Sequence, residues 1–142
     1  MSIEDNRDLI RRYIETWNGG DLDALTAFWS DDLVHHTRDR AHDRTAARAI
    51  VAGFMQGFPD LRFEILDIVA EGDRVATRLR AAATHRRDYM GVPATGRRIE
   101  CELMAITRVV DGRIVEHWGI TDELRLMQQI GLLPEEYLAA MA

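Results

Sequence analysis

The sequence predicts an α+β domain in which three N-terminal helices pack in the concave face of a curved, mainly antiparallel sheet, followed by a C-terminal helix. Apolar residues recur at helical spacing through the first part of the chain. Beyond Phe58-Pro59-Asp60 their spacing changes from about 3.6 residues to about 2, as expected for strands. The pair Asp111-Gly112 lies between two β-rich runs, which is a strong hairpin signal because both central turn positions favour positive φ.

Three helices are expected before the main sheet. Residues 4–17 place their apolar side chains on one helix face, and Asn18-Gly19-Gly20 ends this helix because glycine tolerates the left-handed C-terminal conformation. Asp21 is a favourable N-cap for a short second helix, and residues 45–56 form the third. The preceding residues 38–44 are polar and are expected to be irregular.

The strands are expected to enclose a cavity. Residues 33–37 form a short strand ending in His35-His36, and at most one of these side chains points inward because strand side chains alternate. An antiparallel meander follows, comprising residues 62–71, 74–85, 97–110 and the run after Asp111-Gly112. A helix at 123–130 and a helical turn from Pro134 end the chain. A sheet curved around the N-terminal helix creates an apolar cavity, a natural site for a small hydrophobic ligand.

Length and composition indicate one domain spanning residues 1–142. A hydrophobic content of 46% and a charged content of 30% are typical of globular proteins. The net charge of −6 argues against nucleic acids and anionic membranes as partners. The sequence has no apolar run long enough to span a membrane, and its acidic N-terminus does not resemble a signal peptide, so a cytoplasmic location is expected.

Several kinds of catalysis are excluded by residue type. All 18 basic residues are arginine, which rules out Schiff-base catalysis and covalent pyridoxal attachment through lysine. The single cysteine, Cys101, cannot form an internal disulfide and is interpreted as a small buried side chain. The pair His35-His36 lacks the spacing of a zinc motif. The residue types therefore argue against lysine-based covalent catalysis and against a zinc site.

The strand after the Asp111-Gly112 turn carries the strongest candidate for chemistry. If the strand is regular, Glu116, Trp118 and Asp122 share one mostly apolar face, and His117 faces outward, where it can meet a second copy in a homodimer. A carboxylate desolvated on such a face becomes a stronger base and a usable acid. A single bulge would instead expose Glu116. Asp122 also lies where a helix begins, so it is equally a candidate N-cap unless Thr121 takes that position.

Four segments together resemble a known family. They are WNGGDLDAL, GFPDLRFEILDIVAEGDRVATRLRAAATH, MGVPATGR and DGRIVEHWGITDELRLMQQIG, and they resemble the SnoaL-like polyketide cyclases of the nuclear transport factor 2-like cone superfamily. The resemblance extends over roughly residues 7–133. It implies an enzyme that closes a ring of an aromatic polyketide methyl ester by intramolecular aldol condensation, without metal or organic cofactor. The expected partner is thus a hydrophobic small-molecule substrate.

The resemblance also implies roles for individual residues. The family's acid/base Asp, four residues after the Trp of the last strand, corresponds to Asp122, and the His that ends the first strand corresponds to His36. These two are the predicted catalytic residues. The predicted substrate-binding residues are His85, Trp118, Glu102, Tyr13 and Trp17. Neutral donors among them can hold the oxyanion that develops during an aldol reaction.

The sequence differs from the family near the expected mouth of the cavity. Ala83 replaces the glycine of the family's Gly-Thr-His run, whose histidine corresponds to His85, and Arg86-Arg87 follow it. Pro93-Ala94 replaces a common Pro-Pro pair. These differences bear on the natural substrate more than on the fold.

Two other functions fit the same sequence. A hydroxylase- or epoxide-hydrolase-like enzyme would use several acids around a water molecule, for which Glu102, Glu116 and Asp122 are candidates. A non-catalytic module for small-molecule binding or dimerisation would have a cavity without a convergent acid.

Overall fold

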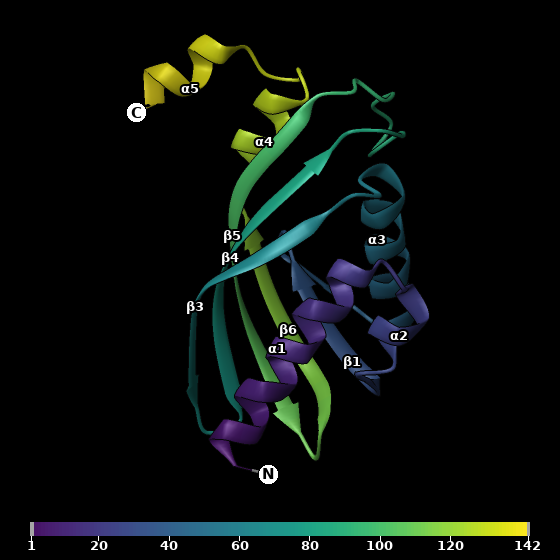
Figure 1. Ribbon diagram of the computed structural model, residues 1–142, viewed down its shortest axis with the longest axis vertical. Coiled ribbons are helices and arrows are strands. Elements are labelled where there is room, and N and C mark those ends of the chain that lie inside the picture. Colours follow the sequence, from purple (N-terminus) through teal and green to yellow (C-terminus); the bar gives the residue numbers. More distant parts are fainter. Residues whose placement is uncertain (1, 142) are drawn as a thin grey trace.

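The computed structural model describes residues 2–141 and has helices packed on one face of a curved sheet (Figure 1). The helices are α1 (Ile3–Gly19), α2 (Leu22–Thr26), α3 (Arg44–Gly57), α4 (Glu123–Gln129) and α5 (Glu135–Met141). The strands are β1 (Trp29–Thr37), β2 (Arg40–His42), β3 (Arg62–Glu71), β4 (Arg74–Thr84), β5 (Arg98–Val110) and β6 (Arg113–Thr121). The predicted α+β class is confirmed.

The six strands form one mixed sheet in the order β2-β1-β6-β5-β4-β3. The predicted antiparallel meander of β3 to β6 is confirmed, and β1 joins it by pairing in parallel with β6. The expectation that residues 38–44 are irregular is wrong, because β2 lies within them. Arg38 and Asp39 have φ angles of 50° and 65°, so they form a tight turn that returns the chain as an antiparallel strand.

The helices begin and end at residues with clear local causes. Ser2 and Asp5 form a capping box at the start of α1, and Gly20 ends this helix with a φ of 72°. Asp43 caps α3 by accepting a hydrogen bond from the backbone N–H of Ala46. Among the described residues, no helix combines the length and apolar character needed to cross a lipid bilayer.

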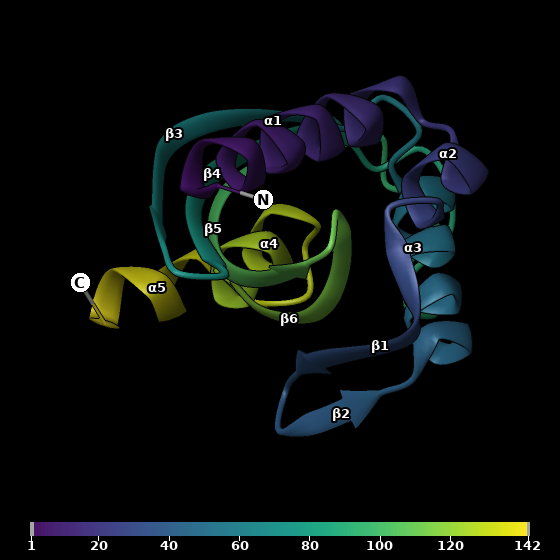
Figure 2. The same cartoon turned by 90° about the horizontal axis from the view of Figure 1, so that it is seen from below.

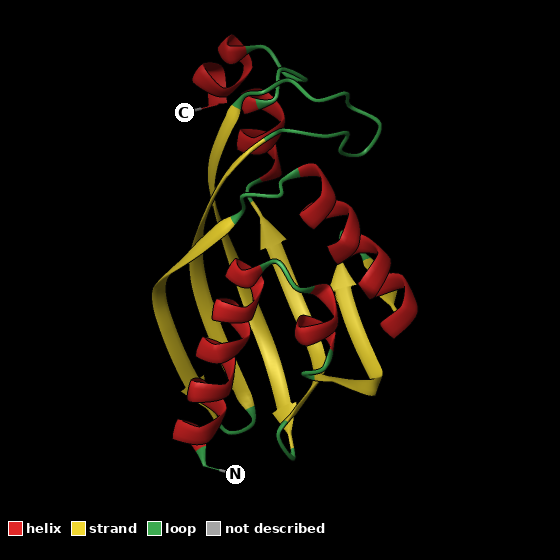
Figure 3. Ribbon diagram, turned by 45° about the vertical axis from the view of Figure 1, so that its right-hand side comes forward, coloured by secondary structure: helices red, strands yellow, loops and turns green. Residues whose placement is uncertain are grey.

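We call the side of the sheet covered by α1, α3 and α4 the inner face, and the opposite side the outer face (Figures 2 and 3). One apolar cluster packs α1 and α3 against the sheet, and its buried side chains include Ile10, Val51 and Leu79. A second cluster packs α4 on β4 and β5, with Leu126 against Ile99. Beside these clusters lie a small hollow between α1 and the sheet, and a larger pocket between α3 and the β1–β2 hairpin.

A β-bulge in β6 determines which of its side chains lie on the inner face of the sheet. Arg108 pairs with Glu116 but Val109 pairs with Ile114, so β6 contains one extra residue at this point. Beyond the bulge, His117 lies on the inner face, and Glu116 and Trp118 lie on the outer face. The faces expected for a regular strand, with Glu116 and Trp118 inward and His117 outward, are therefore wrong, and the alternative in which a bulge exposes Glu116 is the one that the structure has. A single inserted residue reverses the alternation of every following side chain.

Candidate active site

A small hollow of about 70 Å³ lies between α1 and the inner face of the sheet. Tyr13 and Trp17 of α1 line one side, and Thr77, Thr107 and His117 line the other. Tyr13 and Trp17 are both predicted substrate-binding residues, and their contact with a substrate stays a prediction. The hollow is large enough for a small polar group of a ligand but not for a ring system.

The hydroxyl of Tyr13 is held inside the protein by a neighbouring tryptophan. It accepts a hydrogen bond from the Trp29 indole N–H at 2.9 Å. Burial raises the pKa of Tyr13 to about 12, and hydrogen bonds with Trp29 and Trp17 oppose this shift only in part. The phenol therefore stays protonated at neutral pH.

Three histidines lie side by side across β2, β1 and β6. His35 stacks on His117 with ring centroids 4.9 Å apart, and His42 lies 6.2 Å from His35 on the other side. Thr107 fixes the edge of the His117 ring through a 3.1 Å contact between its hydroxyl and Nδ1. Burial is the main cause that lowers the pKa of His117 to about 3 and that of His35 to about 4, and neighbouring histidines add to it. Both rings are thus neutral at physiological pH.

A larger pocket, which we call the mouth pocket, adjoins this row at His42. It has a volume of about 680 Å³ and lies between α3, the β1–β2 hairpin and the segment after β4. Its lining includes Thr37, Arg38, Arg40, His42, Ala49, Ile50, Gly53, Phe54, Gln56, Asp88, Tyr89 and Met90. This volume and this mixture of aromatic, apolar and a few charged side chains suit a drug-sized organic ligand. Among residues 2–141, no cluster of His, Cys, Asp or Glu has the arrangement of a metal site.

Asp122 lies at the junction between β6 and α4. Its Oδ1 accepts a hydrogen bond from the backbone N–H of Arg125 at 3.1 Å, so of the two alternatives open from the sequence the structure has the N-cap. Its own N–H continues the sheet by donating to the carbonyl of Glu102 at 3.0 Å. Burial raises the pKa of the inward-facing Cys101 to about 11, and the nearby Asp122 charge adds to this shift. Asp122 itself is exposed, and its backbone partner Glu102 follows the buried Cys101 on β5.

The predicted residues His36 and Trp118 do come together, but on the outer face. Their rings stack with centroids 5.1 Å apart, and His36 Nε2 lies 2.7 Å from the Glu116 carboxylate. This hydrogen bond is the main cause that holds the pKa of Glu116 below its usual value. His36 and Trp118 line a second pocket of about 580 Å³ beside the β1–β2 turn and the end of β6. Asp122 is not among its lining residues, so the structure does not join the two predicted catalytic side chains in one site.

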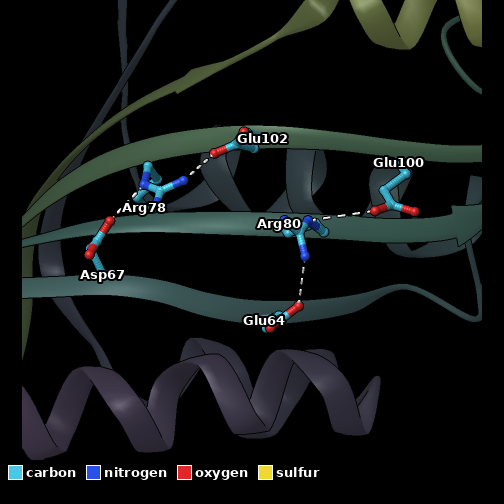
Figure 4. Close-up of polar contacts among 6 residues, drawn as sticks. All are labelled: Glu64, Asp67, Arg78, Arg80, Glu100 and Glu102. Atoms are coloured by element: carbon cyan, nitrogen blue, oxygen red, sulfur yellow. Dashed lines mark hydrogen bonds and ion pairs between the residues drawn. The ribbon is translucent and has the colours of Figure 1, made fainter.

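The remaining predicted site residues lie away from the mouth pocket. Glu102 is on the outer face and pairs with Arg78 at 2.6 Å, so its expected inward placement is wrong (Figure 4). His85 is completely buried, and its Nδ1 lies 3.0 Å from the Thr95 hydroxyl. The backbone N–H of Thr95 also donates to this nitrogen at 3.3 Å. His85 thus braces the segment that follows β4.

Comparison with known proteins identifies the family of this chain. A model of the SnoaL-like polyketide cyclases matches residues 7–130. The chain belongs to the SnoaL-like polyketide cyclase family.

Two curated relatives of this SnoaL-like protein are aklanonic acid methyl ester cyclases. DauD of Streptomyces sp. (strain C5) is 30% identical over 131 residues, which cover 87% of this chain and 80% of DauD. DnrD of Streptomyces peucetius is 27% identical over 129 residues, which cover 87% of this chain and 89% of DnrD. These similarities indicate a polyketide cyclase-like role.

A solved structure shares both fold and sequence with the SnoaL-like chain. AclR of Streptomyces galilaeus, a proposed hydroxylase, superimposes with a TM-score of 0.89 and is 36% identical, and the match covers 94% of this chain and all of AclR's. The curved, unclosed sheet described above is therefore the SnoaL-like cone.

Sequence reasoning missed His117 and Tyr89 as lining residues of this SnoaL-like cone, and it missed His35 as the partner of His117 in the stack. His117 was missed because the bulge in β6 reverses the side-chain alternation. His35 was missed because the family resemblance gave the role to its neighbour His36. Tyr89 had one usable signal: it lies in the long connection after the second strand of the meander, and such loops often carry binding residues.

Proposed function

We propose that this SnoaL-like protein is a cofactor-independent polyketide cyclase of the lyase or isomerase type. It closes a ring of an aromatic or polyketide-like substrate by intramolecular aldol chemistry, with Asp122 as the general acid/base. The observation that carries the proposal is the position of Asp122 at the junction of β6 and α4, where its N–H donates to the carbonyl of Glu102, the residue after the buried Cys101. The similarity to two ester cyclases supports the reaction class.

The mouth pocket is the proposed binding site for the hydrophobic substrate. Phe54 and Tyr89 offer aromatic surfaces for a fused-ring compound, and the row of three histidines extends from this pocket to the hollow beneath α1. In the proposed reaction, Asp122 removes a proton alpha to a carbonyl. The enolate carbon then forms a bond to a second carbonyl carbon, and Asp122 returns its proton to the new alkoxide. Substrate folding in the pocket supplies much of the rate through orientation.

Asp122 has to leave its capping position, or share it, for this role. A single hydrogen bond from the Arg125 N–H holds the carboxylate in the unliganded chain, and a bond of this kind contributes about 1 kcal/mol. A bound substrate can supply that free energy. The direct test is turnover of an aromatic polyketide methyl ester by Asp122→Asn, because asparagine still caps the helix but cannot accept the proton.

Hydroxylation is the second candidate function, and the 36% identity to AclR favours it. The two reactions differ in mass balance. An intramolecular aldol closure produces an isomer of the substrate, whereas hydroxylation adds one oxygen atom. Mass spectrometry of the product therefore distinguishes them. A chain that binds polyketides without changing their mass or chromatographic behaviour would support a non-catalytic binding module instead.

We also propose that the outer face forms a homodimer. This face carries exposed apolar side chains, namely Val69 (65% exposed), Met104 (60%), Ile106 (42%) and Ile120 (79%). They border a shallow pocket of about 530 Å³ together with Trp118. Beside this patch, Arg78 is held between Asp67 and Glu102, and Arg80 between Glu64 and Glu100 (Figure 4). Both arginines thus have carboxylate partners within the chain. The favourable free energy of association with a second copy therefore comes from burial of the apolar patch.

Replacing Ile120 with aspartate is expected to shift the protein from dimer to monomer. A standard interface buries about 800 Å² per partner, roughly a tenth of this chain's 8219 Å² of accessible surface, and a charge at its apolar centre costs several kcal/mol. Light scattering after gel filtration measures the change. Leu132→Asp is the matched control, since Leu132 is also exposed (50%) but lies after α4. A wild-type chain that is monomeric at high concentration contradicts the proposal.

A further inference from the structure

Tyr89 is an aromatic side chain of the mouth pocket that contacts two phenylalanines. Its ring contacts Phe54 at 5.3 Å and Phe58 at 5.0 Å, both in edge-to-face geometry. Phe58 itself is completely buried. A methyl group added at Gly57 would approach the Tyr89 Cβ to 3.0 Å, so glycine there leaves the room that lets Tyr89 lie against the end of α3. The ring is fixed before any ligand binds.

The backbone of Tyr89 is fixed by a small hairpin. Its N–H donates to the Val92 carbonyl at 3.0 Å, and the Val92 N–H donates to the Tyr89 carbonyl at 2.9 Å. Met90 and Gly91 form the turn, with φ angles of 49° and 79°. The paired hydrogen bonds and the aromatic contacts together define one orientation for the side chain.

The Tyr89 hydroxyl lies among polar groups from three other elements. Arg38 from the β1–β2 turn influences it, and this guanidinium binds Glu123 of α4 at 2.7 Å and contacts the Met90 sulfur at 3.5 Å. The inward-facing Cys101 is also close. Burial raises the pKa of Tyr89, with Arg38 opposing and Glu123 adding to the shift, so the phenol keeps its proton at neutral pH. It is a neutral hydrogen-bond donor beside a cation.

Tyr89 and Asp122 approach the same part of the molecule from different elements. Tyr89 packs against the apolar cluster that contains Cys101, and Asp122 binds the backbone of Glu102, the residue after Cys101. Glu123, the residue after Asp122, is tied to Arg38, whose guanidinium contacts the sulfur of Met90, the residue after Tyr89. An aldol closure needs a base for the alpha proton and a donor for the oxygen on which negative charge develops. The donors predicted from the sequence are not at the mouth pocket: His36 and Trp118 are on the outer face and His85 is enclosed.

We infer that Tyr89 is the oxyanion donor of this enzyme, giving its O–H hydrogen bond to the enolate oxygen while Arg38 adds positive charge behind it. The inference rests on the proposed cyclase function and assigns a second catalytic side chain to it. Tyr89 keeps its proton throughout. The alpha proton passes to Asp122 and from there to the new alkoxide, so the reaction needs no other reactant.

The first test compares turnover by Tyr89→Phe with turnover by the wild type. Phenylalanine keeps the contacts with Phe54 and Phe58 and removes only the hydroxyl, so the melting temperature is expected to change little. Loss of one oxyanion donor lowers kcat by about 10²–10³-fold. If the single variant Tyr89→Phe keeps the wild-type kcat while the single variant Asp122→Asn is inactive, the inference is overturned and the cyclase proposal stays intact.

A binding experiment tests the donor without catalysis. The para-nitrophenolate ion mimics a planar enolate oxyanion, and para-nitroanisole has nearly the same shape without the charge. We expect the wild type to prefer the phenolate by about tenfold or more, and Tyr89→Phe to lose about tenfold of that preference, as for one charge-assisted hydrogen bond. The absorption band of the bound phenolate reports the contact directly. An equal preference in both proteins, or no preference in the wild type, refutes Tyr89 as the oxyanion donor.

Discussion

Asp122→Asn is expected to lower kcat by about 10²–10⁴-fold while the folded chain stays nearly as stable as the wild type. Asparagine and aspartate are equally good N-caps, so the bond to the Arg125 N–H is kept. The change removes only the negative charge and the ability to accept a proton. Loss of the charge at the N-terminus of α4 costs about 1 kcal/mol or less. Steady-state kinetics and thermal unfolding of the same preparation measure the two effects separately.

Two controls separate catalysis from capping. Asp122→Ala removes both the carboxylate and the cap, and is expected to lose the same activity with about 1 kcal/mol of additional destabilisation. Asp21 makes the equivalent cap of α2, with the Ala24 N–H at 3.1 Å, so Asp21→Asn applies the same chemical change at a distant helix start and is expected to keep full activity. If Asp122→Asn turns over substrate like the wild type, Asp122 is a structural cap and the acid/base must be sought among the residues that line the mouth pocket.

Acidification is expected to destabilise the protein before most carboxylates are protonated. In the unfolded chain a histidine has a pKa of about 6.5, whereas in the folded chain burial lowers the pKa of His117 to about 3 and that of His35 to about 4. Above pH 6.5 both states are neutral and the histidines have no effect on stability. As the pH falls below about 6.5, the unfolded chain takes up protons that the folded chain excludes. The free energy of unfolding then falls by up to about 1.4 kcal/mol per pH unit for each histidine.

Urea unfolding at several pH values between about 7 and about 5 measures this slope in a window where few carboxylates titrate. His117→Asn is expected to flatten the pH dependence, because asparagine does not titrate and can still contact the Thr107 hydroxyl. His35→Asn is expected to have the same effect through the other member of the stack. A pH dependence that is equally steep in both variants and the wild type would mean that the stacked histidines are readily protonated in the folded state.

The fold was predictable because its signals are local. The apolar spacing in residues 4–17, the glycines at 19–20, and the Asp111-Gly112 turn each act within a few residues, and the structure has a helix, a helix end and a hairpin there. The strand β2 was missed because its cause is a turn at Arg38-Asp39, two non-glycine residues with positive φ that composition does not signal. The parallel pairing of β1 with β6 was missed for a different reason: it joins segments far apart in sequence.

The candidate site was predictable only in part. Tyr13 and Trp17 line the inner hollow because helical periodicity assigns their face correctly. The assignments on β6 failed together, since one bulge beyond Ile114 turned Glu116 and Trp118 outward and His117 inward. Asp122 could be named from its spacing to Trp118, but whether its carboxylate caps α4 depends on where that helix begins.

The sequence by itself determined the class of fold, the family and the absence of lysine chemistry, because these follow from periodicity, local turns and residue types. Only the tertiary structure decided which side chains share the cavity. In the folded chain His35 stacks on His117, Tyr89 packs against Phe54 and Phe58, and His36 lies on the outer face. The physical reason is that cavity membership depends on strand register and on contacts between distant segments. A one-residue change in register reverses the face of every residue that follows.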